Sequence, residues 1–330
     1  MRLALAVPNL LAIERAVLAG IPGLARLARY AGVPIAEPAG MDHALIVAAG
    51  LPRDTPVASL AARGAGLAAG AAFLLRADPV SLVAGRDDVL LAGRVDDLGI
   101  DDAAALVATL NGHFAGDGLV FHAPRPDAWF LTLRDDVRPV TTPLPAVRGA
   151  IYPHLPRGEH GKAWRRWMSE MQMLLHEHAV NAAREARGFA SVTGIWVWGG
   201  GDSGPTRVQE TTRILAPPGP AGDVARGLAA QTQFAAQPPP AIFAALPAAA
   251  SAIVVLPAIA DPPAASAWAH AWLDPALAAL ERGALSEFAL LADGAGSAVT
   301  WNAPRPPWTL RARARFAAER FAPPATDDPQ

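Results

Sequence analysis

The sequence predicts an α/β protein with a mostly parallel sheet, helices on both faces of that sheet, and additional antiparallel hairpins. Short apolar runs without polar alternation, such as residues 2–7 and 253–256, are typical of strands buried on both faces. Segments with apolar residues at three- and four-residue spacing alternate with these runs and predict helices. Two further runs, 118–122 and 128–133, are separated by Pro-Arg-Pro at 124–126 and predict a hairpin.

The first half of the chain contains two more strand signals and one clear helix. Strands are expected at 72–76 and 88–92, and a helix runs from Asp101, whose side chain can cap it, to about His113. The stretch 138–161 is rich in Pro, Gly and Arg. It is the best candidate for a long connection or a subdomain boundary within an otherwise single domain of 330 residues.

The second half begins with the longest expected helix, at about 162–187, where Trp, Met and Leu recur at helical spacing. A buried strand at 192–198 follows directly. The segment 216–250 is an Ala-, Pro- and Gly-rich connection. The last two expected elements are a helix at 264–282 and a strand at 288–291.

Composition excludes several classes of function. The formal net charge is −2, so there is no domain-scale basic face for nucleic acid. The chain has no cysteine, which excludes disulfides, zinc–thiolate sites, iron–sulfur clusters and thiol nucleophiles. The N-terminal apolar run is short and is interrupted by Pro8 and Asn9, unlike a signal peptide. We expect a cytoplasmic protein with no nucleic-acid or membrane partner.

A glycine run follows the strand expected at 192–198. The letters GGGDSG at 199–204 fit G-x-G-x-x-G, but Pro205 and a segment with no clear helix follow, so a dinucleotide fingerprint is incomplete. A tight glycine turn at the end of a strand is the simpler interpretation. Consecutive glycines still let a backbone approach a ligand and hold an anion. Gly199, Gly200 and Gly201 are therefore candidate ligand-binding residues.

The letters His176-Glu177-His178 invite a metal site, but position 180 is Val180, so the H-E-x-x-H pattern is absent. On a continuous helix, residues two apart point about 200° away from each other. The two histidines therefore cannot hold one ion unless the helix is broken, and no metal ligands are assigned.

A polar stripe lies on the same expected helix. His178, Asn181 and Glu185 share a face, as do Glu177, Asn181 and Arg184. Such a stripe is a solvated face, a buried hydrogen-bond network, or one wall of a polar pocket, and the sequence leaves these alternatives open.

Three more polar residues lie within or beside apolar segments. Arg76 follows an apolar strand and can hold a carboxylate or a phosphate in its planar fork, although a structural turn network with Asp78 explains the pattern equally well. His113 closes a helix, where a histidine is favourable to the helix dipole without further function.

Four segments together resemble a known bacterial family. They are LLRADPVSL (74–82), LNGHF (110–114), QMLLHEHAVNAAREARG (172–188) and GIWVWGGG (194–201), and they span roughly residues 70–205. The family is usually called "regulatory protein, RpfE type", and is also described as phosphoglycerate mutase-like. Its label comes from gene context and implies little about chemistry.

A weaker likeness is to cofactor-independent phosphoglycerate mutases of the archaeal type, in the alkaline phosphatase superfamily. The segment with His178, Asn181 and Arg184, followed by Ile195–Gly201, resembles theirs. The resemblance implies an alkaline phosphatase-like fold. It also implies two divalent metals held by Asp and His clusters, and a Ser or Thr nucleophile.

The chain departs from that pattern where the metals would bind. The first strand of such enzymes ends in an aspartate, whereas here it ends in Val7-Pro8-Asn9. Asp261 is followed by prolines, and Asp293 is followed by Gly294 where a histidine is expected. The resemblance therefore favours the fold and argues against the activity.

The leading hypothesis is a non-catalytic pseudoenzyme of this fold, with a regulatory role and a retained polar pocket. We expect no cofactor, and an unknown small anionic ligand or a protein partner. The alternative is a metal-dependent phosphotransferase or phosphoglycerate mutase with an unusual ligand set, which would use a divalent metal. The expected pocket residues are Arg76, Asp78, His113, His178, Asn181, Arg184, Gly199, Gly200 and Gly201.

Overall fold

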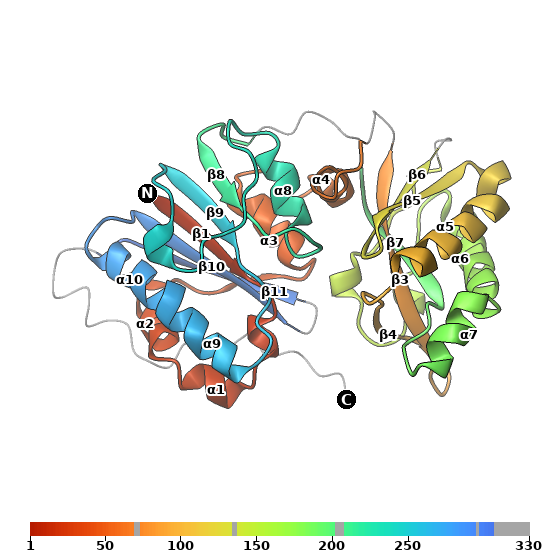
Figure 1. Cartoon of the computed structure of the whole chain (residues 1–330), viewed down its shortest axis with the longest axis horizontal. Coiled ribbons are helices and arrows are strands. Elements are labelled where there is room, and N and C mark those ends of the chain that lie inside the picture. The colour runs from red at the N-terminus through yellow and green to blue at the C-terminus, as the bar shows by residue number, and fades with distance from the viewer. Residues whose placement is uncertain (69–72, 134–136, 202–207, 295–296, 307–330) are drawn as a thin grey trace. The chain divides into compact units, whose positions relative to one another are not determined.

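The chain divides into two compact units in a computed structural model that describes residues 1–68, 73–133, 137–201, 208–294 and 297–306. Unit 1 comprises Met1–Arg53 and Thr206–Gln330, and unit 2 comprises Asp54–Pro205 (Figure 1). Unit 2 is thus inserted between the two halves of unit 1. The chain passes between the units at 53/54 and 205/206, so 138–161, the boundary expected from the sequence, lies inside unit 2.

Unit 1 is built on a mixed six-stranded sheet in the order β2-β11-β10-β1-β9-β8. Its strands are β1 (Arg2–Val7), β2 (Ile35–Glu37), β8 (Thr212–Leu215), β9 (Ser251–Val255), β10 (Glu287–Gly294) and β11 (Ser297–Pro304). Strand β1 lies between β10 and β9 and is parallel to both, and β8 is parallel to β9. Strand β11 is antiparallel to β10 and to β2. This confirms the predicted α/β class, with mostly parallel strands and added antiparallel hairpins.

Helices cover both faces of this sheet (Figure 1). They are α1 (Arg15–Ala19), α2 (Pro22–Tyr30), α3 (Met41–Ala48), α8 (Asp223–Ala229), α9 (Pro262–Trp268) and α10 (Asp274–Glu281), with a π turn at Ala269–Leu273 between the last two. Leu3 and Leu5 of β1 are buried in one core cluster with Leu24 of α2, Trp268 of α9 and Leu277 of α10. Helices α3 and α8 lie on the other face. The segment 216–250, expected to be a connection, contains α8.

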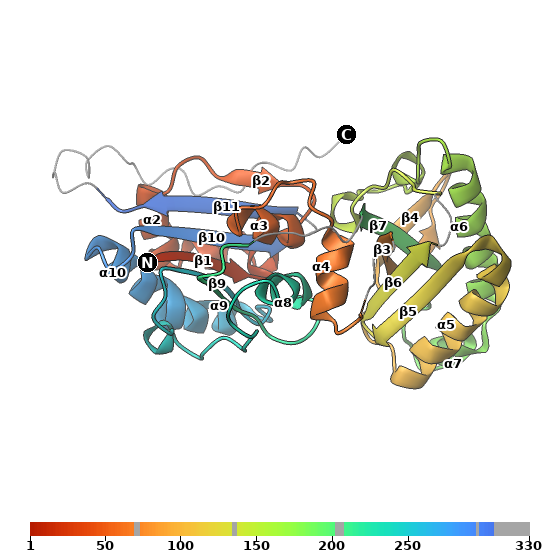
Figure 2. The ribbon, with the colours of Figure 1, turned by 90° about the horizontal axis from the view of Figure 1, so that it is seen from above.

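Unit 2 is built on an antiparallel sheet with the strand order β4-β3-β6-β5, in which β3 also pairs with β7. The strands are β3 (Leu74–Ala84), β4 (Val89–Arg94), β5 (Leu119–Arg125), β6 (Ala128–Leu133) and β7 (Gly194–Gly201). The helices are α4 (Val57–Gly64), α5 (Ile100–Phe114), α6 (Gly161–His176) and α7 (Ala179–Ala186). Figure 2 shows α5, α6 and α7 on one side of this sheet.

The alternation of residues along β3 decides which side chains meet that core. Leu75 and Ala77 are buried in one cluster with Leu106 of α5 and Trp164 of α6. Because successive strand residues point to opposite faces, Arg76 and Asp78 project from the other face of the sheet.

Two details differ from the expected elements. The single helix expected at 162–187 is two helices, because the backbone leaves the helical region at His178, which becomes the cap of α7. Strand β7 continues through Gly199–Gly201, so no tight turn forms at these glycines, and the rest of the GGGDSG motif lies outside the described residues. No helix in the described parts of the chain is both long and apolar enough to cross a membrane.

Candidate functional site

A fully buried carboxylate, Asp78 on β3, lies at the centre of a cluster of charged side chains in unit 2. Its side chain is 1% exposed, and Nη2 of Arg76 lies 3.1 Å from Oδ1. Arg94 of β4 approaches the same oxygen, with Nη1 at 3.6 Å. The other oxygen accepts a hydrogen bond from the indole N–H of Trp198 at 2.6 Å. The Arg76 guanidinium also lies over the Trp198 ring, 5.2 Å from its centre. One carboxylate thus fixes two arginines and a tryptophan from three neighbouring strands.

This environment keeps Asp78 ionised. Burial alone would raise the pKa of Asp78, but the positive charges of Arg76 and Arg94 and the hydrogen bonds from Trp198 and Arg76 outweigh it. The pKa of Asp78 therefore lies below its ordinary value. The arginines face a permanent negative charge at neutral pH and are held in fixed orientations.

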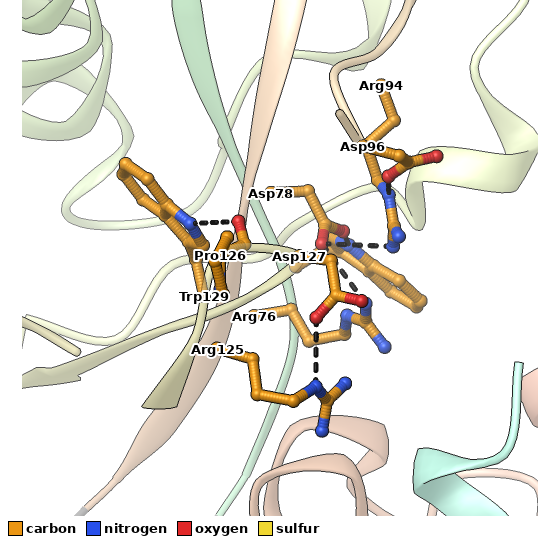
Figure 3. A network of polar contacts seen from close by, with 9 residues as sticks. Arg76, Asp78, Arg94, Asp96, Arg125, Pro126, Asp127 and Trp129 are labelled. Carbon is orange, nitrogen blue, oxygen red and sulfur yellow. Dashed lines mark hydrogen bonds and ion pairs between the residues drawn. The ribbon is translucent and has the colours of Figure 1, made fainter. Parts of the chain in front are cut away.

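Two further Arg–Asp pairs belong to the same network of polar contacts (Figure 3). Nε of Arg94 donates to Asp96, and Nε of Arg125 donates to Oδ1 of Asp127 at 2.9 Å. The side chains of Arg94 and Arg125 are 20% and 29% exposed, so the guanidinium groups at the rim reach solvent. The result is a buried ionic centre with an arginine-rich rim, which we call the Asp78 network (Arg76, Asp78, Arg94, Asp96, Arg125, Asp127 and Trp198).

A short sequence pattern, repeated three times, marks this network. Arg76-Ala77-Asp78, Arg94-Val95-Asp96 and Arg125-Pro126-Asp127 share the pattern Arg-x-Asp. Within β3, residues two apart lie on the same face, so Arg76 meets Asp78; Asp96 and Asp127 follow just after the ends of β4 and β5, where each contacts the arginine that closes the strand. Residue-by-residue reasoning found Arg76 and Asp78 but missed Arg94, Arg125 and Trp198.

The other predicted residues lie elsewhere in unit 2. Asn181 is 2% exposed, and its side-chain amide donates to the carbonyls of Leu175 and Val192, each at 2.7 Å. Its oxygen accepts the Val192 N–H at 2.9 Å. Asn181 therefore joins the end of α6 to the segment that leads into β7, in the manner of a buried hydrogen-bond network.

His178 and Arg184 hold the same helix in place. Nδ1 of His178 accepts the Val180 N–H at 3.2 Å, and its Nε2 lies 3.0 Å from the Thr109 hydroxyl. Arg184 is 1% exposed and donates to the Asp97 carboxylate and, at 2.9 Å, to the Ala190 carbonyl. These contacts join α7 to α5 and to the loops beside it.

His113 and the three glycines also lie outside the Asp78 network. His113 is partly exposed at the end of α5, with Nε2 3.3 Å from a Glu170 oxygen. The glycines allow close packing: a Cβ on Gly201 would lie 2.1 Å from Cγ of Pro56, and one on Gly200 would lie 2.5 Å from Cδ2 of Leu75. Gly199 has φ +67°, a conformation that favours glycine. Of the nine predicted residues, only Arg76 and Asp78 belong to the Asp78 network.

A second candidate site is the edge of the unit 1 sheet formed by the carboxyl ends of its parallel strands, because ligands of α/β proteins commonly bind at such an edge. Asn9 has φ +62°, the only positive φ among the described residues other than glycine, and its N–H donates to Oδ1 of Asp293 at 2.6 Å. Burial, together with the nearby charge of Asp42, raises the pKa of Asp293. In the part of the chain that the structure describes, no three His, Asp or Glu side chains are grouped so that they could share a metal ion.

Comparisons with known proteins give only remote similarities. No protein-family model matches the sequence, and no curated protein does. Among solved structures, the chain is similar to a cofactor-independent phosphoglycerate mutase from Thermoplasma acidophilum DSM 1728, with 13% identity, 96% of this chain and 95% of that chain covered, and a TM-score of 0.44. It is also similar to the PH0037 protein from Pyrococcus horikoshii, with 13% identity, coverages of 92% and 87%, and a TM-score of 0.47. Membership of the RpfE-type family stays a prediction.

Proposed function

We propose that the protein is a non-catalytic, phosphoglycerate mutase-like protein with a regulatory role, which binds a small anion at the Asp78 network. The observation that carries this proposal is the single buried carboxylate that orients Arg76 and Arg94. The rim arginines, Arg94 and Arg125, would contact the ligand, and Arg76 and Asp78 would hold the site in position.

The energetics of the network favour a binding role over a purely structural one. Replacing a buried ion pair by well-packed apolar residues is often neutral or stabilising, so such a pair is weak evidence for stability. A planar guanidinium matches a carboxylate or a phosphate in two parallel hydrogen bonds, and a fixed orientation lowers the entropic cost of making them.

Arg94 is the residue best placed for contact with the ligand. Its Nε and Nη1 face Asp96 and Asp78. For Nη2 no hydrogen-bond partner is found within the described residues, and the side chain is 20% exposed. A partly exposed guanidinium with two nitrogens facing carboxylates and a third without a partner is a preorganised anion donor.

The non-catalytic part of the proposal rests on the carboxyl edge of unit 1. There Asp293 accepts the backbone N–H of Asn9 and so fixes the loop after β1. The Asp293 carboxylate holds the loop that follows β1, and the residue in that loop is Asn9 and not an aspartate. Both observations support a structural role for this edge.

Isothermal titration calorimetry of the full chain with inorganic phosphate and with 3-phosphoglycerate tests the binding. Arg94→Gln removes the guanidinium without changing the Asp78–Arg76 pair, and should weaken binding at least about tenfold. Arg166→Gln is the matched control, because Arg166 is an exposed arginine of α6 with its own acidic partners. Equal binding by wild type and Arg94→Gln, or no binding of either probe, would refute the proposed site.

The rival function is a metal-dependent mutase or phosphotransferase. Mutase and phosphatase assays on the same protein, with Mn²⁺ or Zn²⁺ added, should give no turnover. Turnover that requires the added metal would establish the rival and overturn the non-catalytic assignment.

A further inference from the structure

Unit 1 contains a cavity that is unrelated to the Asp78 network. Its volume is about 380 Å³, within the usual range of small-molecule sites. It lies on the sheet face that carries α3, and residues of β1, β9, β10 and β11 form its floor. The C-terminal half of α3 and the residues after it line one side.

Small side chains at the centre of the sheet create this hollow. Ala4 of β1 and Ala289 of β10 are direct partners in the parallel register, and both line the cavity. Both remain partly exposed, whereas Leu3 and Leu290 on the opposite face are fully buried. Larger apolar residues at these two positions would fill the cavity. The space above the centre of the sheet therefore depends on the two alanines.

The charges in the cavity wall cancel. Arg2 and Glu287 are Cα partners on adjacent parallel strands, and Glu37 forms an ion pair with Arg53. Two positive and two negative groups line the same space. Cross-strand neighbours of opposite charge attract each other, so no net field selects an anion or a cation. This balance sets the cavity apart from the arginine-rich rim in unit 2.

Hydrogen-bonding groups complete the wall. Glu37 is only 3% exposed, and among the described residues Arg53 is the sole side-chain partner of its carboxylate. A carboxylate offers about four acceptor positions, so acceptor capacity remains. The uncharged polar side chains of the wall can both donate and accept; they are Gln209, Thr212, Ser251, Thr300 and Asn302.

We infer that this cavity is a second ligand site, for an uncharged heterocycle of nucleoside size. The flat apolar floor contacts the ring, the Glu37 carboxylate accepts adjacent N–H donors from the ring edge, and the hydroxyl and amide side chains bind the polar substituents. Two adjacent N–H donors facing one carboxylate form two parallel charge-assisted hydrogen bonds; guanine offers such a pair in its ring N1–H and its exocyclic N2 amino group, and adenine lacks it.

Saturable binding of guanosine to the full chain, measured by calorimetry, is the primary test, with adenosine and inorganic phosphate as comparison probes. Guanosine should bind with one-to-one stoichiometry and at least about tenfold more tightly than adenosine. Glu37→Gln should lose at least about tenfold in guanosine affinity, since an amide cannot accept both N–H groups. Phosphate should not compete.

Filling the hollow supplies an independent test. Ala289→Leu should abolish guanosine binding, and Ala4→Leu on the neighbouring strand should do the same if the first variant folds poorly. Ala267→Leu on the exposed side of α9 is the control and should bind like wild type. Binding that survives both filling variants in folded protein, absence of guanosine binding, or displacement of guanosine by phosphate would each overturn the inference. Loss of phosphate binding in Arg94→Gln leaves this test unaffected, so the two sites fail or succeed separately.

Discussion

Replacing Asp78 by Asn should destabilise unit 2 strongly, because it removes one charge of a buried ion pair at almost constant size. The Asp78 and Arg76 side chains are 1% and 4% exposed, so water cannot compensate the arginine left behind. Breaking such a pair from one side costs about 3–5 kcal/mol. In a unit of about 150 residues each kcal/mol corresponds to about 2–4 °C, so the melting transition of unit 2 should fall by about 10 °C.

The assay must report on unit 2 by itself, because a chain with two compact units need not unfold in a single two-state transition. Native-state hydrogen exchange of the amides of β3 and β7, with urea unfolding at pH 7, reports on unit 2 alone. The double variant Arg76→Met/Asp78→Leu should recover part of the lost free energy, since it removes the Arg76 and Asp78 charges together, while Trp198 still loses its acceptor.

The loss of stability in Asp78→Asn should depend on pH. The pKa of Asp78 is lowered in the folded state, so its stabilisation is present above the ordinary aspartate pKa and is lost as the pH falls through the folded pKa. The difference between wild type and Asp78→Asn should therefore shrink in acid. A loss below about 1 kcal/mol at pH 7, or a difference that does not change with pH, would refute the reasoning.

Four other substitutions probe the packing around two glycines, the buried polar network and the carboxyl edge. Gly112→Ala should stabilise the protein by about 0.5–1 kcal/mol, because Gly112 lies within α5 and a Cβ there would meet no other atom. Gly201→Ala should destabilise it, because the new Cβ would lie 2.1 Å from Cγ of Pro56. Equal melting temperatures of the two variants would contradict this. Asn181→Ala should cost about 2–4 kcal/mol in urea unfolding, since it strands buried backbone groups, and a cost near zero would mean that water replaces the amide. Burial and a neighbouring carboxylate raise the pKa of Asp293, so wild-type stability falls as the pH rises through that pKa; Asp293→Asn should be more stable at neutral pH, and parallel pH profiles would contradict this.

Much of the fold was predictable where the signal is local. Strand β1 occupies 2–7 as expected, and the hairpin of β5 and β6 forms around the predicted turn. A strand buried on both faces leaves an apolar run, and a hairpin leaves a turn signal between two runs. Both are visible in a window of about ten residues.

The insertion of unit 2 could not be found in this way. The partners of β1 are β9 and β10, and no short window of sequence contains both sides of these pairings. The break between α6 and α7 was missed for a related reason. The helical spacing of apolar residues continues across the break. His178 caps α7 by accepting the Val180 N–H, and its ring is held in that position by Thr109 of α5, which is distant in the sequence.

The site was predictable only in part. Arg76 and Asp78 were identified together because they lie on one face of one strand. Arg94 and Trp198 reach Asp78 from β4 and β7, and the register of those strands is set by the whole sheet. For the stripe with His178, Asn181 and Arg184 the sequence left a solvated face, a buried hydrogen-bond network and a pocket wall open. The contacts of these residues with Thr109, with Asp97 and with backbone carbonyls come from other elements, which a helical stripe does not reveal.

The position of β1 between β9 and β10 has a consequence for synthesis of the chain. Strand β1 is made long before its neighbours, because β9 and β10 do not exist until the ribosome has passed residues 251–294. The whole of unit 2, with its own apolar core, is made in between. Domains generally fold as units during synthesis, at about 5–20 residues per second, so the nascent β1 waits for at least about ten seconds with its edges unpaired. An apolar strand in that state is prone to aggregate. Yield in cells should therefore depend on chaperones that shield β1 until β9 and β10 have been made.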